Sequence, residues 1–451
     1  MRKSKYLILS SFYIEFNDDL TKIINMKYSF WPQNVLDLDR FNNLKSINGL
    51  FDYKYLNFIF LPSSVTRLKH HIFNGFKLKF LDLSNYINLK IIDSKAFYNN
   101  KIECVKLPIN IEMILEDAFV KNQIKRLDLS QCIKLKSIKK SAFYENNIKY
   151  LKLPENIEEI HEDAFKSNEI KYLTLPQGIR LIGLNAFWAN EIKHIDFSKC
   201  INLKIIEDKS FLGNKIRELK LPKNIEKIGM FAFSNNKIEI LDLSYCINLK
   251  NIKEYAFFEN QIKYLKLPKN IEIIKGWAFS INQIKILDLS KCIKLKNIEV
   301  YAFSINQIKQ LKLPKNIEII KGWAFEKNKI EILDLSNYIK LKSINNLAFE
   351  ENSIKQLKLP KNIEILGNFA FYSNQIEILD LSNYTKLKEI KELSFLDNPL
   401  KRIKILDDIM IEYNNDYKND LWNRFVEYYN KNNKKSGDYK LENDEWQWYP
   451  L

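Results

Sequence analysis

The chain has 451 residues and a formal net charge of +16, from 71 Lys and Arg against 55 Asp and Glu. Hydrophobic residues make up 46% of it and only 10 Gly and 11 Pro are present, so the composition excludes a disordered or linker-rich chain. No run of roughly 18 apolar residues, the length that predicts a membrane-spanning helix, occurs.

Residues 1–30 precede the motif that dominates the rest of the chain. Met1–Leu9 joins basic residues to a short apolar run, as a signal peptide does. No small-residue cleavage site follows, and Glu15, Asp18 and Asp19 come soon afterwards. We therefore expect an intracellular protein that is not secreted, in which residues 1–30 form an N-terminal cap.

Over residues 31–398 a phenylalanine, mostly within Ala-Phe, marks a regular repeat. Successive steps alternate between 22 and 24 residues, so the higher period is 46 residues, and two 22-residue steps follow each other only once. The sixteen positions are Phe51, Phe73, Phe97, Phe119, Phe143, Phe165, Phe187, Phe211, Phe233, Phe257, Phe279, Phe303, Phe325, Phe349, Phe371 and Phe395. Such self-similarity predicts a solenoid in which each repeat packs on its neighbours.

Each repeat also contains Leu-x-Leu or a close variant. Both leucines of this segment point to one side and x to the other, so it predicts a short strand that pairs with the next repeat. A proline follows in the short repeats and ends the strand, because proline has no N–H to donate. An asparagine lies three residues after fourteen of the sixteen phenylalanines, from Asn100 to Asn398, and predicts a tight turn.

The repeat resembles the BspA-like class of leucine-rich repeats. Residues 265–282 read LKLPKNIEIIKGWAFSIN, similar to the class pattern L-x-L-P-x-x-(I/V)-x-x-I-x-x-x-A-F, and the resemblance covers roughly residues 35–398. It implies an α/β-type leucine-rich repeat solenoid with one curved parallel sheet of about sixteen short strands and a convex side that is irregular or made of short helices. It also implies a role in adhesion or protein–protein contact, although fold alone does not prove function.

Residues 399–451 are predicted to form a C-terminal cap. Leu421, Trp422, Phe425, Val426 and Tyr429 have near-helical spacing, which favours a short helix. The segment from Gly437 to Trp448 is compatible with a short hairpin. The alternative is a small separate binding tail.

Catalytic and metal-binding patterns are missing from the sequence. No nucleophile or metal ligand stands at a usable spacing from the histidines, and no P-loop, zinc-protease or dinucleotide motif occurs. The four histidines are His70, His71, His161 and His194. We expect no enzyme, no cofactor, no metal and no small-molecule substrate.

Four of the five cysteines share one slot of the long repeats: Cys132, Cys200, Cys246 and Cys292. Tyrosine fills that slot in other long repeats, as at Tyr86. Consecutive long repeats lie two strands apart, roughly 9.5 Å, which exceeds the distance of about 7 Å that a disulfide can bridge. We therefore expect free, semi-buried packing residues.

The residue between the two leucines is Asp in long repeats and usually Lys in short ones. Neighbouring strands about 4.8 Å apart would then alternate Lys and Asp along the concave face. Where two short repeats meet, the order is Lys152, Thr174, Asp196, which avoids a contact between like charges. This ladder neutralises itself and is a poor stripe for nucleic-acid phosphates.

The residue before the first leucine also points outward, and it varies along the chain. In the first half it is largely aromatic or mixed, and exposed aromatics near arginine are typical of protein-binding surfaces. The candidate partner-binding residues are Phe58, Phe60, Phe80, Arg126, Tyr150, Tyr172, His194 and Tyr264. The alternative for Phe58, Phe60 and Phe80 is that an N-terminal cap covers them.

The sequence therefore favours a non-enzymatic, monomeric scaffold that binds a protein partner on the concave face. The alternative is an acidic partner, either nucleic acid or an anionic surface, bound through the excess lysine. The bias towards Ile, Lys and Asn is typical of an AT-rich genome, such as that of a giant DNA virus or a protist.

Overall fold

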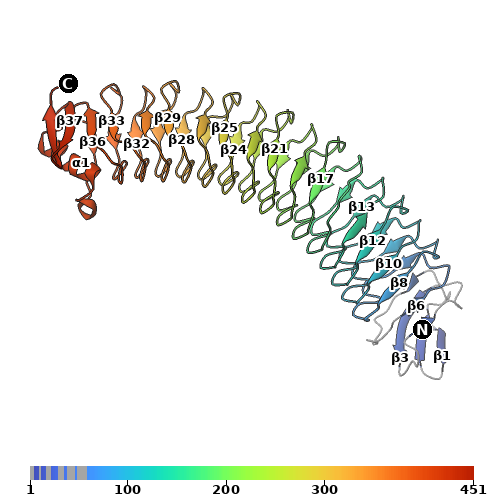
Figure 1. Ribbon diagram of the computed structural model, residues 1–451. Helices are drawn as coiled ribbons and strands as arrows, with labels where there is room; N and C mark the ends of the chain where they lie inside the picture. Colours follow the sequence, from blue (N-terminus) through green and yellow to red (C-terminus); the bar gives the residue numbers. More distant parts are fainter. Residues whose placement is uncertain (1–4, 10–11, 17–21, 29–34, 38–45, 48–57) are drawn as a thin grey trace. The chain divides into compact units, whose positions relative to one another are not determined.

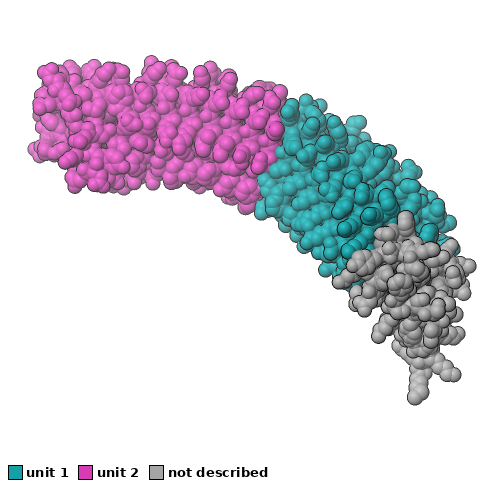
Figure 2. All heavy atoms as spheres, turned by 60° about the horizontal axis from the view of Figure 1, so that its bottom comes forward, with its two compact units in different colours: residues 1–224 teal, residues 225–451 magenta. Residues whose placement is uncertain are grey.

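The computed structural model describes residues 5–9, 12–16, 22–28, 35–37, 46–47 and 58–451, with side chains from Ile59 onward. The chain divides into two compact units, Met1–Asn224 and Ile225–Leu451 (Figure 2). Within each unit the chain coils as a parallel β-solenoid (Figure 1). This confirms the predicted leucine-rich repeat solenoid.

The Leu-x-Leu segments form the first ladder, in which the strands pair in parallel and in register within short groups, as Leu81 does with Val105. The strands of unit 1 are β4 (Val35–Asp37), β6 (Phe58–Phe60), β8 (Phe80–Asp82), β10 (Cys104–Lys106), β12 (Arg126–Asp128), β14 (Tyr150–Lys152), β17 (His194–Asp196) and β19 (Glu218–Lys220). Those of unit 2 are β21 (Ile240–Asp242), β23 (Tyr264–Lys266), β25 (Ile286–Asp288), β27 (Gln310–Lys312), β29 (Ile332–Asp334), β31 (Gln356–Lys358), β33 (Ile378–Asp380) and β35 (Arg402–Ile405).

A second ladder of two-residue strands, which the sequence did not predict, follows about ten residues after the first in each turn. In unit 1 it comprises β5 (Ser46–Ile47), β7 (Arg67–Leu68), β9 (Ile91–Ile92), β11 (Met113–Ile114), β13 (Ser137–Ile138), β15 (Glu159–Ile160), β16 (Leu181–Ile182) and β18 (Ile205–Ile206). In unit 2 it comprises β20 (Lys227–Ile228), β22 (Asn251–Ile252), β24 (Ile273–Ile274), β26 (Asn297–Ile298), β28 (Ile319–Ile320), β30 (Ser343–Ile344), β32 (Ile365–Leu366), β34 (Glu389–Ile390) and β36 (Met410–Ile411). The last isoleucine of the repeat motif before Ala-Phe therefore belongs to a sheet, because it pairs with the same position of neighbouring turns, as Ile274 does with Ile252.

The phenylalanines of the repeat form a buried column on the side of the coil that follows the second ladder. From Phe73 to Phe211 in unit 1 and from Phe233 to Phe395 in unit 2, each ring is fully buried. Neighbouring rings stack with centroids 5.2–5.9 Å apart. Offset stacks at this distance add to the stabilisation from burial alone, by about 0.5–1.5 kcal/mol per pair.

The asparagine three residues later forms a second buried column beside the first. Asn122 is typical: its Oδ1 accepts from Ile102 N at 3.1 Å, and its Nδ2 donates to Phe97 O at 2.9 Å, both in the preceding turn. The sequence predicted a local turn for this residue. In the structure the side chain also joins one turn to the next, so it satisfies backbone groups that burial would otherwise leave without a partner.

The turn around each phenylalanine has residues with positive φ two positions before and two positions after it. Trp277 (φ 62) and Ile281 (φ 54) flank Phe279 in this way. Left-handed backbone costs a bulky residue roughly 1–2 kcal/mol. The cost is met by backbone hydrogen bonds to the next turn, from Trp277 N to Val300 O and from Ile281 N to Ser304 O, each 3.1 Å.

Antiparallel strands lie at both ends of the array. At the beginning, β1 (Lys5–Leu9), β2 (Phe12–Phe16) and β3 (Lys22–Tyr28) form a meander whose last strand pairs in parallel with β5. At the other end come η1 (Asn415–Tyr417), α1 (Leu421–Lys431) and the hairpin β37 (Gly437–Glu442)–β38 (Glu445–Tyr449), which pairs antiparallel with β35.

The helix α1 covers the end of the phenylalanine column. The Trp422 ring lies 4.9 Å from the Phe395 ring and is fully buried. Asp420 caps the helix by accepting from Trp422 N at 2.9 Å. Within the described part of the chain this is the only α-helix, so the turns between the ladders contain none.

Replacing one asparagine of the column is expected to destabilise the whole array. Asn306 accepts from Ile284 N at 3.1 Å and donates to Phe279 O at 2.9 Å. Because Asn306→Ala leaves Ile284 N buried without a partner and leaves Phe279 O with only the bond from Asn282 Nδ2 at 3.2 Å, we expect a loss of about 1–3 kcal/mol in the free energy of unfolding. Urea denaturation followed by circular dichroism measures it, with Asn337→Ala, an exposed asparagine of the same unit, as the control. Equal midpoints for the two variants would contradict the role given to the column.

Candidate interaction surface on the first ladder

The first ladder has one buried and one exposed side. Its strands follow the pattern exposed–buried–exposed, as in β8, β12 and β14, so the leucine enters the core and the residues on either side of it reach solvent. We call this exposed surface the strand face. It carries two columns, the variable residue before the leucine and the Lys or Asp after it.

The Lys and Asp column forms ion pairs between neighbouring strands. Lys106 Nζ lies 2.9 Å from Asp82 Oδ2, and the equivalent distances are 3.9 Å for Lys220 to Asp196 and 3.7 Å for Lys358 to Asp334. These groups are exposed, so each pair contributes at most about 1 kcal/mol. The alternation of charge nevertheless leaves this column close to neutral.

The aspartates also have a local role that the sequence analysis missed. Ser84 donates to Asp82 Oδ1 through its backbone N at 3.1 Å and through Oγ at 2.5 Å, and the same bonds recur in most long repeats, as from Ser290 to Asp288. The hydrogen bond from Ser84, followed by that from Lys106, lowers the pKa of Asp82. The Asp-Leu-Ser sequence is thus a side-chain-stabilised turn that ends the strand.

Four of the candidate residues lie side by side on the strand face of unit 1. Arg126 is the register partner of Tyr150, and single parallel bridges join Tyr150 to Tyr172 and Tyr172 to His194. The Arg126 guanidinium carbon lies 4.3 Å from the Tyr150 ring centroid, a cation–π contact. Tyr150 is 42% and Tyr172 69% exposed, so a partner could bury much apolar area here.

A depression of about 420 Å³ adjoins these tyrosines. It lies where the two short repeats meet, and Tyr150, Tyr172, Lys152 and Thr174 are among the residues that line it. Thr174 is shorter than the lysine usual at its position, so the substitution that avoids a contact between like charges also opens space beside Tyr172. The row Arg126, Tyr150, Tyr172 and His194, with this depression, is called the aromatic row.

The other candidate residues are not part of this row. Phe60 and Phe80 keep 49% and 55% exposure, and Phe80 is separated from Arg126 by the strand of Cys104. The side chain of Phe58 lies outside the described residues. Tyr264 belongs to unit 2, where Lys266 Nζ lies 5.2 Å from its ring.

The slot shared by Cys and Tyr is buried and tied to the preceding turn. Cys132 donates to Pro108 O at 3.7 Å, whereas Tyr338 Oη accepts from Leu313 N at 3.0 Å. Burial raises the pKa of the Cys132 thiol to about 11, which makes the thiolate scarce at neutral pH. Cys132, Cys200, Cys246 and Cys292 are free and buried, as expected for packing residues, and Cys104 is free and exposed.

A stack of aromatic rings in unit 2 was missed by the sequence analysis. The five rings are contributed by the residue before Ala-Phe in successive turns: Phe231, Tyr255, Trp277, Tyr301 and Trp323. Their centroids are 3.8–5.6 Å apart and they are half-buried. The strings YAF and WAF signalled the stack, but the column could be placed only once the turn geometry was known. Because the ring faces contact one another, the stack is mainly a packing feature.

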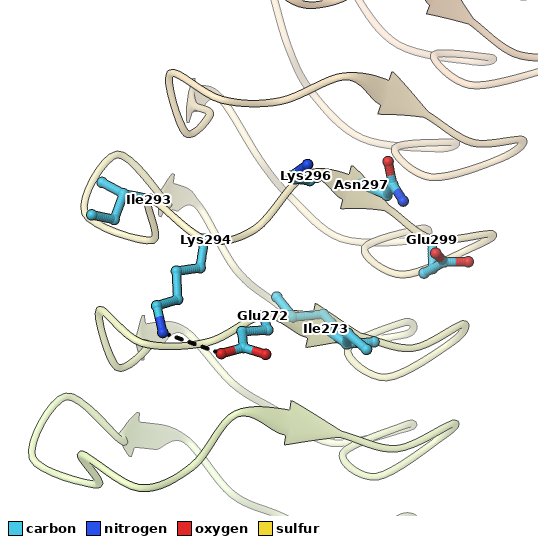
Figure 3. Close-up of a pocket in the computed structure, with 8 residues that line it drawn as sticks. Glu272, Ile273, Ile293, Lys294, Lys296, Asn297 and Glu299 are labelled. Carbon is cyan, nitrogen blue, oxygen red and sulfur yellow. Dashed lines mark hydrogen bonds and ion pairs between the residues drawn. The ribbon is translucent and has the colours of Figure 1, made fainter.

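A second depression, of about 520 Å³, lies beside the second ladder of unit 2 (Figure 3). Ile273, Ile293 and Asn297 are among its lining residues. Figure 3 shows Lys294 reaching across to Glu272, with Nζ and Oε1 3.2 Å apart. This ion pair neutralises one side of the depression, so the depression is a weak binding site for a charged small molecule.

Within the described residues, no group of three or more His, Cys, Asp or Glu side chains is arranged to hold a metal ion. Among the same residues, no helix is long and apolar enough to cross a membrane.

The solenoid, its repeat and its exposed strand face define a leucine-rich repeat protein. The family model described as BspA type leucine rich repeat region matches residues 45–169, 136–257, 240–341 and 296–420, which is more than half of the chain. The protein therefore belongs to the BspA-type leucine-rich repeat family. Proteins built of such repeats are generally interaction scaffolds that use their extended surfaces for binding.

The structure is similar to several solved structures. A leucine-rich repeat protein from Bacteroides ovatus is 18% identical, with 90% of this chain and 89% of that chain covered and a TM-score of 0.37. A leucine rich cell surface protein from Faecalibacterium prausnitzii is 16% identical, with 92% and 97% covered and a TM-score of 0.36. The functional domain of InlJ from Listeria monocytogenes is 15% identical, with 79% and 70% covered and a TM-score of 0.43. No curated protein matches the sequence.

Glu350 gives a pH dependence that can be tested. Burial, followed by the charges of Glu326 and Glu351, raises the pKa of Glu350 to about 7. A carboxyl whose pKa is higher in the folded state binds more protons there than in the unfolded chain between about pH 4.5 and 7. Its contribution to stability is therefore complete at low pH and is lost as the pH rises through that window.

We expect Glu350→Gln to reduce the fall in the urea midpoint between pH 5 and pH 8 and to be more stable than the parent at pH 8, because the amide carries no charge. Glu331→Gln, which removes an exposed carboxylate of the same unit, is the control. If both variants keep the pH profile of the parent, Glu350 does not titrate in this window.

Proposed function

We propose that the chain is a non-enzymatic, monomeric scaffold that binds a protein partner through the aromatic row on the strand face of unit 1. The carrying observation is the side-by-side placement of Arg126, Tyr150 and Tyr172 on neighbouring strands. Tyrosine and arginine are among the side chains most enriched in binding hot spots, and tyrosine offers a large contact area for little loss of conformational entropy.

The setting of the row supports this proposal. Strand pairing joins the backbone of Arg126 to that of Tyr150, and single bridges join Tyr172 to Tyr150 and His194, so the row is ordered before it binds. The adjacent depression gives an irregular relief to an otherwise repetitive surface, which favours one partner and one position along the solenoid. The near-neutral Lys and Asp column supports a protein partner over nucleic acid on this face, because phosphate binding needs net positive potential.

An intracellular location and a source with an AT-rich genome, such as a giant DNA virus or a protist, belong to the same proposal. They are supported by the free cysteines and by the bias towards Ile, Lys and Asn.

We expect the triple variant Arg126→Ala, Tyr150→Ala, Tyr172→Ala to lose a partner that the parent captures from a lysate of source or host cells. Quantitative mass spectrometry of the captured proteins measures the loss, which should exceed tenfold because truncation of a hot-spot residue costs about 2 kcal/mol or more. Circular dichroism should be unchanged, since all three side chains are exposed.

The matched control is Ile286→Ala, Gln310→Ala, Ile332→Ala, which truncates three exposed residues of the same column in unit 2. A partner lost with the first triple and kept with the second supports the aromatic row. Equal capture by the parent and both triples would show that the binding surface is elsewhere.

A further inference from the structure

The turns that lead from the first ladder to the second have a distinct charge in unit 2. The central residues of these turns are 243–249, 267–271, 289–295, 313–317, 335–341, 359–363 and 381–387, and together they contain seven Lys and no Asp or Glu. The residue just before the second ladder is Lys in four of the turns and Glu272, Glu318 or Glu364 in the other three. The corresponding turns of unit 1, from residue 61 to residue 224, contain three Lys and one Glu. We call the turn surface of unit 2 the lysine edge.

Most of the lysines on this edge have no acidic partner. Lys294 is paired with Glu272 at 3.2 Å (Figure 3). The other six are exposed and form no ion pair within the part of the chain that the structure describes: Lys269, Lys291, Lys315, Lys340, Lys361 and Lys386. The edge therefore differs from the strand face, where the lysines alternate with aspartates.

Exposed isoleucines lie among these lysines. Ile247, Ile293 and Ile339 are 46%, 61% and 61% exposed. They occur in alternate turns, so neighbours are roughly 9.6 Å apart along the solenoid. A single exposed isoleucine needs no explanation, but a row of them at one turn position in a basic surface does.

Hydrogen bonds hold each isoleucine in place. Ile293 O accepts from Asn316 Nδ2 at 3.0 Å, and Ile339 O accepts from Asn362 Nδ2 at 2.8 Å. The residue before each isoleucine is buried at Cys246 and Cys292 and half-buried at Tyr338. The apolar side chains consequently cannot fold back into the core, and the solvent exposure is built into the repeat.

We propose that the lysine edge docks unit 2 on the surface of a bilayer that contains anionic lipids, with the isoleucines entering the headgroup layer. The ammonium groups would be attracted to the negative surface potential, and the isoleucines would leave water. This surface and partner are additional to the protein partner proposed for the aromatic row.

Both components of the edge favour lipid over other polyanions. The phosphates of a nucleic acid would pair with the lysines, but the isoleucines would stay exposed to water, because a contact made to phosphates offers the isoleucines no base or sugar surface. An acidic protein would need a surface that matches isoleucines repeating at every second turn. A fluid bilayer needs no such match, since its lipids rearrange under the edge.

Co-sedimentation of the full chain with vesicles tests the proposal. We expect binding to phosphatidylcholine vesicles that contain about 30% phosphatidylserine, little binding to phosphatidylcholine alone, and weakening as the salt concentration rises. Lys291→Ser, Lys315→Ser, Lys340→Ser should weaken binding on the order of 100-fold, from about fivefold for each lysine. The control Lys285→Ser, Lys309→Ser, Lys329→Ser removes the same charge from exposed positions of unit 2 outside the edge.

The isoleucines have a matched control too. Ile247→Ser, Ile293→Ser, Ile339→Ser should weaken binding at least tenfold, whereas Ile286→Ser, Ile332→Ser, Ile378→Ser, on the strand face with 58–63% exposure, should not. Equal effects of an edge triple and its control would overturn the proposal, because net charge or general hydrophobicity would then account for binding. So would tighter binding to a duplex oligonucleotide than to the anionic vesicles, which would assign the lysines to nucleic-acid phosphates.

Discussion

The stacking of one turn on the next through the phenylalanine and asparagine columns is the interaction on which the rest of the structure depends. Each turn is too short to bury its own apolar residues, so its ring stacks on the rings of its neighbours and its asparagine bonds to the preceding turn as well as to its own. The stack fixes the spacing between turns, and that spacing sets the register of both ladders. Every exposed column, whether variable, charged or apolar, owes its alignment to this buried one.

The sequence predicted the elements that depend on periodicity. The Leu-x-Leu segments predicted the strands, because side-chain direction alternates along a strand. The regular spacing of the phenylalanines predicted the turns, because side-chain direction repeats once per turn of a solenoid. The second ladder escaped prediction since its strands are only two residues long, and a pair such as Asn251-Ile252 has no alternation of its own. The left-handed turn residues also escaped, since Lys, Asp, Trp and Ile occupy positions where glycine or asparagine would have been the signal.

The candidate surface was predictable to a similar degree. Register alone places Arg126, Tyr150, Tyr172 and His194 in one row. Spacing could not reveal that Thr174 helps to form a depression beside Tyr172, or that the aspartates accept from serines two residues later. These properties depend on side-chain size and on the path of the chain after the strand, and neither is periodic. The lysine edge was hidden for another reason: the total charge of +16 says nothing about which lysines have acidic neighbours.

The surfaces of the solenoid differ in whether neighbouring charges neutralise one another. On the strand face Lys and Asp alternate on neighbouring strands, so the variable column beside them decides what binds. At the centre of the turns of unit 2 lysines and isoleucines stand without aspartate or glutamate, and glutamates follow only just before the second ladder, so charge and apolar area act together. A repeat protein can make this distinction at little cost to stability, because an exposed position in one turn changes without disturbing the buried columns. The proposed binding role would account for the uneven distribution of lysine between the turns of unit 1 and unit 2, because a composition bias alone would spread the excess over every turn.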